Sequence, residues 1–347
     1  MIEMIGHDDA VRLLDISFKR NRLSHAYLIN GPKGCGKTLF SKVLASIVNC
    51  EARQVGEEYS LQQKAFCGEC SACYKIERDI HPDLTIIFPE KSTIKIDQIR
   101  DMQKSIYRKP VEGRYKVYVI EQAEKMTEEA QNSLLKILEE PLGDTLILLT
   151  TSNKSQLLPT IASRCNIVNI NGVKEDEVAK WLCEKEGLKK DKAQIIARVS
   201  KGLPGRALDI LKSEKYFKLR KYIFDKVTNL VETKSVLQSI KDSEALINRL
   251  KKDGEESDEI VGQLSCPDEA MEFIADVFGD VIKYSTTGDE NLINNLDQME
   301  NIKKIMTMVN EKECTMIIQK ALRCADKIRA RANSRTAYDE FLLYVVS

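Results

Sequence analysis

The octapeptide GPKGCGKT at residues 31–38 constrains the fold of this chain more than any other feature. It matches the phosphate-loop pattern G-x-x-x-x-G-K-[ST], follows the apolar run AYLIN (26–30) and precedes a helical pattern over 37–49. A strand, a glycine-rich turn and a helix in this order let backbone N–H groups and the helix N-terminus bind phosphate. The alternative is a glycine-rich turn without a ligand. The context favours an α/β nucleotide-binding domain.

The residues of such a loop have separate tasks. The glycines let the backbone close around the phosphates. Lys37 is expected to reach the β- and γ-phosphates, and Thr38 to bind Mg²⁺. The expected cofactor is therefore ATP or ADP with Mg²⁺. The other candidate binding residues of the loop are Gly31, Pro32, Gly34, Cys35 and Gly36.

Strand and helix patterns alternate through the first half of the chain. Asp97 is expected to cap a helix that runs to about 108, and Thr127 to cap EEAQNSLLKILEE, which stops at Pro141. This alternation predicts a parallel five-stranded sheet with helices on both faces. Beyond residue 172 we expect only helices, with a turn at 202–205. The expected strands after the first are 84–88, 116–121, 145–150 and 166–170, and the expected helical breaks are 253–259 and 286–291.

Composition excludes several classes of protein. Lys+Arg and Asp+Glu both total 53, so the net charge is zero and gives no overall signal for nucleic acid. No run approaches the ~18 apolar residues that a membrane helix needs. The start MIEMIGHDDAVRLL predicts an amphipathic helix and not a signal peptide. We therefore expect a cytoplasmic protein, in which ten cysteines serve as thiols or metal ligands and not as disulfides.

Three of the cysteines occur in the heptapeptide CGECSAC at 67–73, and a fourth ends the helix after the phosphate loop. Four thiolates in a closed shell are typical of structural zinc. An iron–sulfur cluster and free thiols are the alternatives. Gly68 would ease the turn between ligands, and His81 is a spare candidate ligand. The predicted ligands are Cys50, Cys67, Cys70 and Cys73.

The order of these motifs resembles a known family. HAYLINGPKGCGKT, the cysteine module, KVYVIEQAEKM with NSLLKILEEP, and LLTTSNKSQLLPTIASRC follow one another. The set is similar to the clamp-loader branch of the AAA+ ATPases in bacterial DNA polymerase III. Within that branch it most resembles the delta-prime type, with gamma/tau as the near relative. The resemblance is strong over 1–210 and weaker over 211–347, where ARANSRTAYDEFLLYVV resembles the family's closing helix.

The resemblance implies a domain plan and a set of partners. It implies an AAA+ domain at 1–172 with the zinc module at 50–73, a helical lid domain at 173–212 and an all-α collar domain at 213–347. The partners would be gamma/tau and delta subunits in a hetero-pentamer, the sliding clamp and primed DNA, with no membrane. The chain would be a cytoplasmic component of the bacterial DNA polymerase III holoenzyme.

Family roles also fall on particular residues. Ser163-Arg164-Cys165 matches the SRC motif, whose arginine reaches the ATP of the neighbouring subunit as a catalytic arginine finger. A surface ion pair is the alternative for Arg164. Thr151 and Asn153 lie near the position of a first sensor of the γ-phosphate. The second sensor would be Arg206, and the adenine pocket would include Gly6 and His7.

The chain departs from the ATPase pattern at the end of the strand 116–121. The metal-polarising acid and the water-activating glutamate should stand at 121 and 122, where the chain has Glu121 and Gln122. Glu121 is one methylene longer than aspartate, and Gln122 can orient water but cannot accept its proton. Glu124 would point elsewhere if the strand ends at 121. We therefore expect nucleotide binding with weak or absent ATPase activity, and a stator that lends Arg164 to a neighbour.

The segment 95–116 is locally basic, with seven Lys or Arg residues against three acids, so 7 − 3 = +4. Arg100 and Lys104 share a helix face that could follow DNA phosphates without reading sequence; a solvated helix is the alternative.

Two other functions fit the phosphate loop. One is an active gamma/tau-type ATPase, and the other is a small-molecule kinase, which leaves the SRC and cysteine motifs unexplained.

Overall fold

The computed structural model describes residues 4–53, 65–140, 143–233, 267–330 and 332–346. Contacts divide the chain into two compact units. The first comprises residues 1–181 with 202–206, and the second comprises 182–201 with 207–347. Pro141, Cys266 and the expected break at 253–259 lie outside the described residues.

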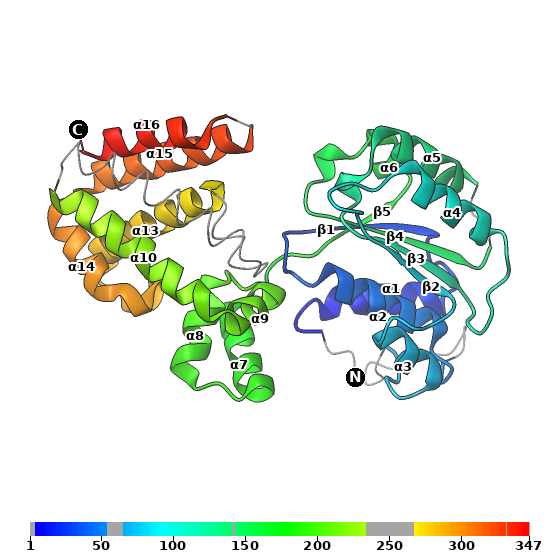
Figure 1. The fold of residues 1–347 in the computed structure, drawn as a ribbon. Helices are drawn as coiled ribbons and strands as arrows, with labels where there is room; N and C mark the ends of the chain where they lie inside the picture. The colour runs from blue at the N-terminus through cyan, green and yellow to red at the C-terminus, as the bar shows by residue number, and fades with distance from the viewer. Residues whose placement is uncertain (1–3, 54–64, 141–142, 234–266, 331, 347) are drawn as a thin grey trace. The chain divides into compact units, whose positions relative to one another are not determined.

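A five-stranded parallel sheet forms the centre of the first unit, as the sequence predicts (Figure 1). Its strand order is β2-β3-β4-β1-β5, so the first strand lies between the last two. The strands β1, β3 and β4 are almost wholly buried, which explains their continuous apolar sequences. The strands are β1 (Ala26–Asn30), β2 (Leu84–Ile87), β3 (Lys116–Ile120), β4 (Thr145–Thr151) and β5 (Asn166–Asn169).

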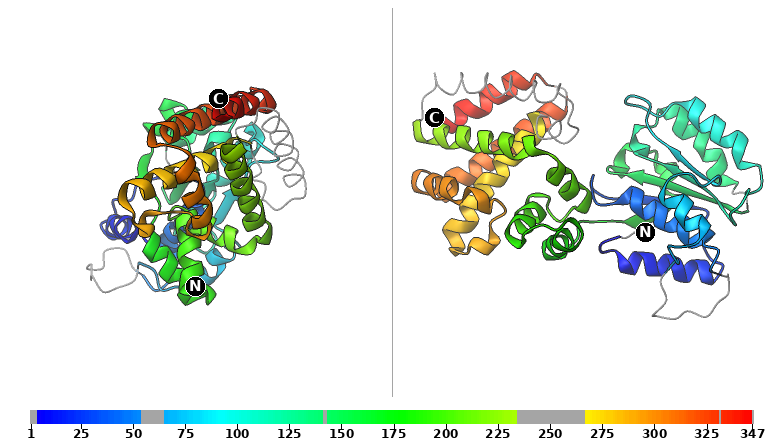
Figure 2. Two further views of the ribbon diagram at one scale, coloured as in Figure 1. Left: turned by 90° about the vertical axis from the view of Figure 1, so that its left-hand side faces the viewer. Right: turned by 60° about the horizontal axis from the view of Figure 1, so that its bottom comes forward.

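Helices cover both faces of this sheet (Figures 1 and 2). One face packs against α1 (Asp8–Lys19), α2 (Lys37–Asn49) and α3 (Ser71–Glu77). The other packs against α4 (Ile96–Ile106), α5 (Glu128–Glu139) and α6 (Pro159–Ala162). Two separate hydrophobic cores result, one on each side of the sheet. The carboxyl ends of the parallel strands therefore share one edge, where ligands bind in open α/β sheets.

Two helix starts test the sequence predictions. Thr127 caps α5 as expected, because its Oγ1 accepts a hydrogen bond from the Ala130 N–H at 3.3 Å. The predicted cap of α4 is wrong. Lys95 is the N-cap and Asp97 lies in the first turn, where its charge still complements the helix dipole.

The second unit is helical throughout its described residues. Its long antiparallel pair is α13 (Pro267–Thr287) and α15 (Glu311–Arg329). α7 (Glu175–Glu186) and α9 (Pro204–Lys212) each have residues in both units. The separation into a lid and a collar at residue 212 stays a prediction. The other helices are α8 (Lys190–Val199), α10 (Glu214–Thr233), α14 (Met299–Met308) and α16 (Ser334–Val346).

A buried polar network joins these helices. Arg220 is fully buried in α10, and its guanidinium donates to Asn295 Oδ1 at 2.5 Å and pairs with Asp297 at 2.8 Å. Asn295 in turn donates to the buried carboxylate of Asp280 on α13. No helix in the described part of the chain is long and apolar enough to cross a bilayer.

Candidate functional site

The phosphate loop lies between β1 and α2, at the carboxyl edge of the sheet. Gly34 and Gly36 have φ values of +84° and +97°, which side chains rarely permit. A Cβ on Gly31 would lie 1.9 Å from the Ile170 carbonyl oxygen. The backbone of this chain therefore requires the glycines of the motif, independently of any ligand.

Lys37 folds back onto its own loop. Its Nζ donates hydrogen bonds to the carbonyl oxygens of Gly31 at 2.7 Å and Pro32 at 2.9 Å. Burial lowers the pKa of the Lys37 ammonium, while the charges of Cys35, Glu124 and Glu121 raise it in part. Lys37 is thus held at the loop with acidic groups close by, and Thr38 follows it in the first turn of α2.

Glu121 comes directly after β3 and is only 6% exposed. Its Oε2 accepts a hydrogen bond from Thr150 Oγ1 at 2.7 Å, and its Oε1 has no partner among the described residues. Gln122 adopts the left-handed conformation at φ 53° and ψ 54°, and its N–H donates to the same hydroxyl at 3.0 Å. Thr150 therefore fixes the turn in which the acid and the amide stand.

The left-handed turn at Gln122 leads into the 3₁₀ helix η1 (Ala123–Lys125), which returns Glu124 towards β4. Glu124 Oε1 accepts hydrogen bonds from the N–H of Ser152 at 3.1 Å and from its Oγ at 2.5 Å. The expectation that Glu124 points elsewhere was wrong, because η1 follows the strand at once. Thr150 and Ser152 were not predicted from the sequence, where the visible signal is a run of hydroxyl residues at the end of an apolar strand.

The predicted first-sensor residues are engaged locally. Thr151 is fully buried, and its Oγ1 accepts a hydrogen bond from the Asn153 N–H at 3.1 Å. Asn153 Oδ1 accepts from the N–H and the Oγ of Ser155, at the start of η2 (Lys154–Gln156). The sensor role of both residues stays a prediction.

The start of α9 lies against the phosphate loop, and both belong to the first unit. The Gly205 N–H donates to the Gly34 carbonyl oxygen at 2.8 Å, and a Cβ on Gly34 would meet the Arg206 nitrogen at 2.9 Å. Arg206 is therefore beside the loop, as the second-sensor prediction requires. Its contact with a nucleotide stays a prediction.

Gly6 and His7 both have positive φ values and lead into α1. A Cβ on Gly6 would meet the Val173 side chain at 2.9 Å, so this segment packs on the chain that follows β5. Burial lowers the pKa of the His7 imidazole, and its Nε2 is buried without a partner among the described residues. That Gly6 and His7 line an adenine pocket stays a prediction.

Arg164 follows α6 and is about one-third exposed. Its Nη2 pairs with Glu139 Oε1 at 2.7 Å, and its Nη1 donates to the Thr160 carbonyl oxygen at 3.1 Å. The structure therefore shows the surface ion pair that the sequence left as the alternative. An exposed pair of this kind contributes only about 0–1 kcal/mol, so it can open for a stronger anion.

The four predicted metal ligands converge. The Sγ atoms of Cys50, Cys67, Cys70 and Cys73 all lie within 4.8 Å of one another. The separations are 3.5 Å from Cys50 to Cys67 and 4.0 Å from Cys67 to Cys73. Zinc–sulfur bonds of about 2.3 Å place the corners of a tetrahedron about 3.8 Å apart. The cluster therefore fits a tetrahedral metal ion.

Further contacts suit thiolate ligands in this cluster. The N–H of Cys67 donates to Cys50 Sγ at 3.4 Å, and the N–H of Cys70 donates to Cys67 Sγ at 3.3 Å. The hydrogen bond between Cys73 and Cys50 lowers the pKa of the Cys50 thiol and raises that of the Cys73 thiol, so it favours a thiolate at Cys50. Gly68 makes the turn at φ +78°. His81 does not join the cluster; its Nδ1 accepts the Asp83 N–H at 3.1 Å.

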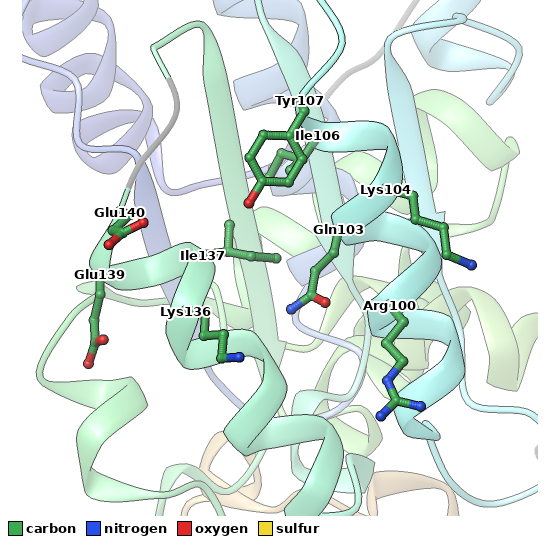
Figure 3. A pocket seen from close by; sticks show the side chains of 9 residues that line it. All are labelled: Arg100, Gln103, Lys104, Ile106, Tyr107, Lys136, Ile137, Glu139 and Glu140. Carbon is green, nitrogen blue, oxygen red and sulfur yellow. The ribbon is translucent and has the colours of Figure 1, made fainter.

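A groove of about 770 Å³ lies between α4 and α5 (Figure 3). Arg100, Lys104 and Lys136 line it with positive charge, while Glu139 and Glu140 stand at its other end. Lys136 lies outside the basic segment 95–116 and joins the groove from α5. Arg100 lies 3.6 Å from Asp97 and Lys104 lies 2.8 Å from Asp101, so both cations have acidic neighbours on α4.

The local charge of +4 overstates the basic surface of this helix. Lys116 is buried and donates to the Ser105 carbonyl oxygen at 2.8 Å. Arg114 is half-buried and donates to the Arg53 carbonyl oxygen. Two of the seven basic residues therefore point into the protein.

The sequence is similar to clamp-loader proteins over its first half. Residues 6–174 match a family model described as DNA polymerase III, delta subunit. DNA polymerase III subunit delta' of Bacillus subtilis is 33% identical over 210 residues, covering 60% of this chain and 60% of that protein. The same subunit of Pseudomonas aeruginosa is 39% identical over 148 residues, covering 42% and 43%.

Subunit gamma/tau of Mycobacterium bovis is 28% identical over 215 residues, covering 60% of this chain and 36% of that protein. The matched region thus spans 60% or less of each of these relatives. A solved gamma subunit-related protein of Thermotoga maritima is 21% identical with a TM-score of 0.42, covering 96% and 97%. That score is too low to carry an argument. The family model and the sequence relatives cover the parallel α/β domain and its phosphate loop: residues 6–174 of this chain belong to the clamp-loader family of DNA polymerase III subunits.

Proposed function

We propose that this chain is a delta-prime-type subunit of the DNA polymerase III clamp loader, a cytoplasmic bacterial protein that binds ATP or ADP with Mg²⁺ and hydrolyses it poorly. The observation that carries this proposal is a complete phosphate loop next to Gln122. The backbone of Gln122 is fixed by Thr150, and its side chain is a carboxamide. A carboxamide orients water but takes no proton from it, so hydrolysis lacks its base at this position.

The second part of the proposal is that Arg164 acts on a neighbour. It lies after α6, on a different segment from the phosphate loop after β1, and its guanidinium contacts the exposed Glu139 carboxylate, the Thr160 carbonyl oxygen and the Ser163 hydroxyl. The γ-phosphate of a nucleotide on an adjacent subunit would offer several charged oxygens to the planar fork. The Glu139 pair would then open as the two subunits meet.

The cysteine cluster is proposed to hold structural Zn²⁺. Its four sulfur atoms close the shell, so no position is left for a substrate or a catalytic water. The helices of the second unit are proposed to assemble with gamma/tau and delta subunits, which would place the sliding clamp and primed DNA beside the complex. The groove lined by Arg100, Lys104 and Lys136 is proposed to contact DNA phosphates.

The test of the trans role is a reconstituted loader in which only this chain is changed. Arg164→Ala should reduce turnover at the neighbouring site by about 10³-fold or more, while this chain's own nucleotide affinity stays unchanged. Arg108→Ala, which removes another exposed arginine, is the matched control. Full ATPase activity of the Arg164→Ala complex would contradict the proposal.

DNA contact has a separate test in the same complex. Arg100→Glu combined with Lys136→Glu should weaken binding of primed DNA and reduce its salt dependence, because two phosphate contacts are lost. Arg22→Glu, an exposed residue after α1 on the other face of the sheet, is the control for a reversed charge. Unchanged DNA binding and unchanged DNA-stimulated ATPase would show that the groove is a solvated surface.

A gamma/tau-type ATPase is the second candidate. The intact phosphate loop and the 28% identity to a gamma/tau subunit favour it. Such a subunit supplies arginine fingers to copies of itself, so ATP turnover by the pure chain separates the two candidates.

A further inference from the structure

Two carboxylates act electrostatically on the phosphate-loop lysine, Lys37, although the sequence pattern draws attention to only one of them. Glu121 follows β3 directly, and Glu124 returns through η1. Each has one oxygen that accepts a hydrogen bond from a hydroxyl in or just after β4: Glu121 from Thr150 and Glu124 from Ser152. Thr150 lies within β4, and Ser152 follows its last residue.

The other oxygen of each carboxylate has no hydrogen-bond partner within the described part of the chain. Glu121 Oε1 and Glu124 Oε2 are both buried from solvent and accept no hydrogen bond from the described residues. A buried carboxylate oxygen without a donor is costly, so it indicates a place where a ligand or an ordered water completes the site. Glu121 as a whole residue is 6% exposed, which leaves little bulk water to serve that purpose.

Hydrogen bonds place this pair beside the phosphate loop. Ser152 directly follows Thr151, whose carbonyl oxygen accepts the N–H of Gly31, the first loop residue, at 3.0 Å. Both carboxylates also act electrostatically on Lys37, where they oppose the effect of burial on its pKa. Two carboxylates against one ammonium leave an excess of one negative charge among these three groups.

We propose that Glu124 is a second carboxylate of the nucleotide site and that, with Glu121, it binds the water shell of the nucleotide's Mg²⁺. This inference rests on the proposed nucleotide binding. Mg²⁺ keeps several waters and binds proteins through one or two carboxylates together with phosphate oxygens. Residues that would hold it are Thr38, Glu121 and Glu124.

Because of this charge arrangement, the carboxylates should affect nucleotide affinity in opposite directions with and without Mg²⁺. Without a divalent cation, the excess negative charge repels a polyphosphate; with Mg²⁺, the same charge attracts the cation that the phosphates share. Glu124 should therefore strengthen nucleotide binding only when Mg²⁺ is present. A residue that merely supports the fold of the loop would affect binding equally with and without the metal.

The experiment is a titration of Mg²⁺ into the full chain with a fluorescent ADP, compared with binding of the same ADP in EDTA. Glu124→Gln should raise the Mg²⁺ concentration at half-saturation about tenfold and leave the affinity in EDTA equal or higher. Ser152→Ala, which keeps the carboxylate and removes its hydroxyl anchor, should shift the midpoint in the same direction by less. Glu129→Gln, an exposed residue of α5, should shift nothing.

The outcomes separate the inference from the function on which it rests. If the unchanged chain binds no ADP, the proposed nucleotide binding fails and the inference fails with it. If the unchanged chain binds and Glu124→Gln gives the same Mg²⁺ midpoint, the inference alone is overturned. Equal weakening with Mg²⁺ and in EDTA overturns it too, because that result assigns Glu124 to the fold of the loop.

Discussion

The two ends of α2 carry the two candidate sites of this protein, and they differ in how complete they are. At the C-terminal end, Cys50 caps the helix and its sulfur already lies within 4.8 Å of three others. At the N-terminal end, Lys37 bonds to its own loop, and the free oxygens of Glu121 and Glu124 have no partner among the described residues.

This difference separates stability from function. Where the folded chain brings all the ligands of a metal ion together, the free energy of metal binding stabilises the fold. A site that keeps polar atoms without partners holds them for a ligand, and gains little stability from them. Changes at the cysteines should therefore lower stability, whereas changes at the phosphate loop should lower binding and leave the fold intact.

The largest effect is expected at the cysteine cluster. Cys70→Ser should remove stoichiometric zinc and lower the free energy of unfolding by about 4 kcal/mol or more, because three ligands and a weak fourth no longer close the shell. Metal analysis of the purified protein and urea unfolding measure the two quantities. Cys183→Ser, outside the cluster, is the control. If Cys70→Ser kept its zinc and its full stability, the claim that the cysteine cluster stabilises the fold would be contradicted.

Lys37→Ala should have the opposite effect: it should lower nucleotide affinity and leave the stability of the fold almost unchanged. Loss of its charge-assisted bonds should weaken ATP and ADP binding by about 100-fold, which corresponds to roughly 2.7 kcal/mol. The free energy of unfolding should change by less than about 0.5 kcal/mol, since only two bonds to its own loop are lost. Equilibrium binding and urea unfolding test both values, with Lys109→Ala, an exposed lysine after α4, as the matched control. A large loss of stability would show that the loop is structural.

Asp83 supplies a test that involves neither metal nor nucleotide. Its buried carboxylate accepts the N–H groups of Val111, Glu112 and Gly113 at 2.7, 2.8 and 2.7 Å. Burial alone would raise the pKa of Asp83, but these three bonds outweigh it and the net shift is downward. Because the pKa is lower in the folded state, the stabilisation is present above the unfolded value of about 3.9 and is lost as pH falls through the folded value.

Asp83→Asn should therefore cost about 2 kcal/mol at pH 7, where three donors lose a charged acceptor. The difference between the variant and the unchanged protein should narrow as the pH falls below 4. Urea unfolding at a series of pH values measures it. A difference that stays constant down to pH 3 would show that the carboxylate charge is not what holds this loop.

The smallest effect is expected at the contact between the phosphate loop and the start of α9. A Cβ on Gly205 would lie 2.9 Å from the Gly34 carbonyl oxygen, so Gly205→Ala must displace the loop slightly. Nucleotide affinity should fall by about three- to tenfold, measured as for Lys37. Gly279→Ala, where the new methyl group meets nothing within 4 Å, is the control. Unchanged affinity would show that the loop can adjust without loss.

Much of this arrangement is visible in the sequence, because it depends on local patterns. The five strands and the helix after the phosphate loop were predicted within about a residue, since buried runs and glycine turns carry strong signals. The convergence of the four cysteines was also predicted. Three of them lie within the heptapeptide at 67–73. The fourth, Cys50, ends the helix that follows the phosphate loop.

What the sequence did not reveal depends on backbone turns and on neighbours distant in the chain. Glu124 contacts Ser152 because Gln122 adopts a left-handed backbone conformation. A glutamine in the sequence does not predict that conformation. Lys136 joins Arg100 only because α4 and α5 pack side by side (Figure 3). Lys116 was counted as surface charge although the sheet buries it.

The central claim is that the site holds nucleotide without turning it over efficiently. The most direct measurement follows ADP binding and ATP turnover in one sample of the pure chain, with Mg²⁺ and primed DNA present and with Lys37→Ala as the background. The account predicts saturable ADP binding that Lys37→Ala weakens about 100-fold, together with ATP turnover no higher than that of the variant. Turnover well above the background would contradict it and identify an active gamma/tau-type ATPase in which Gln122 is tolerated.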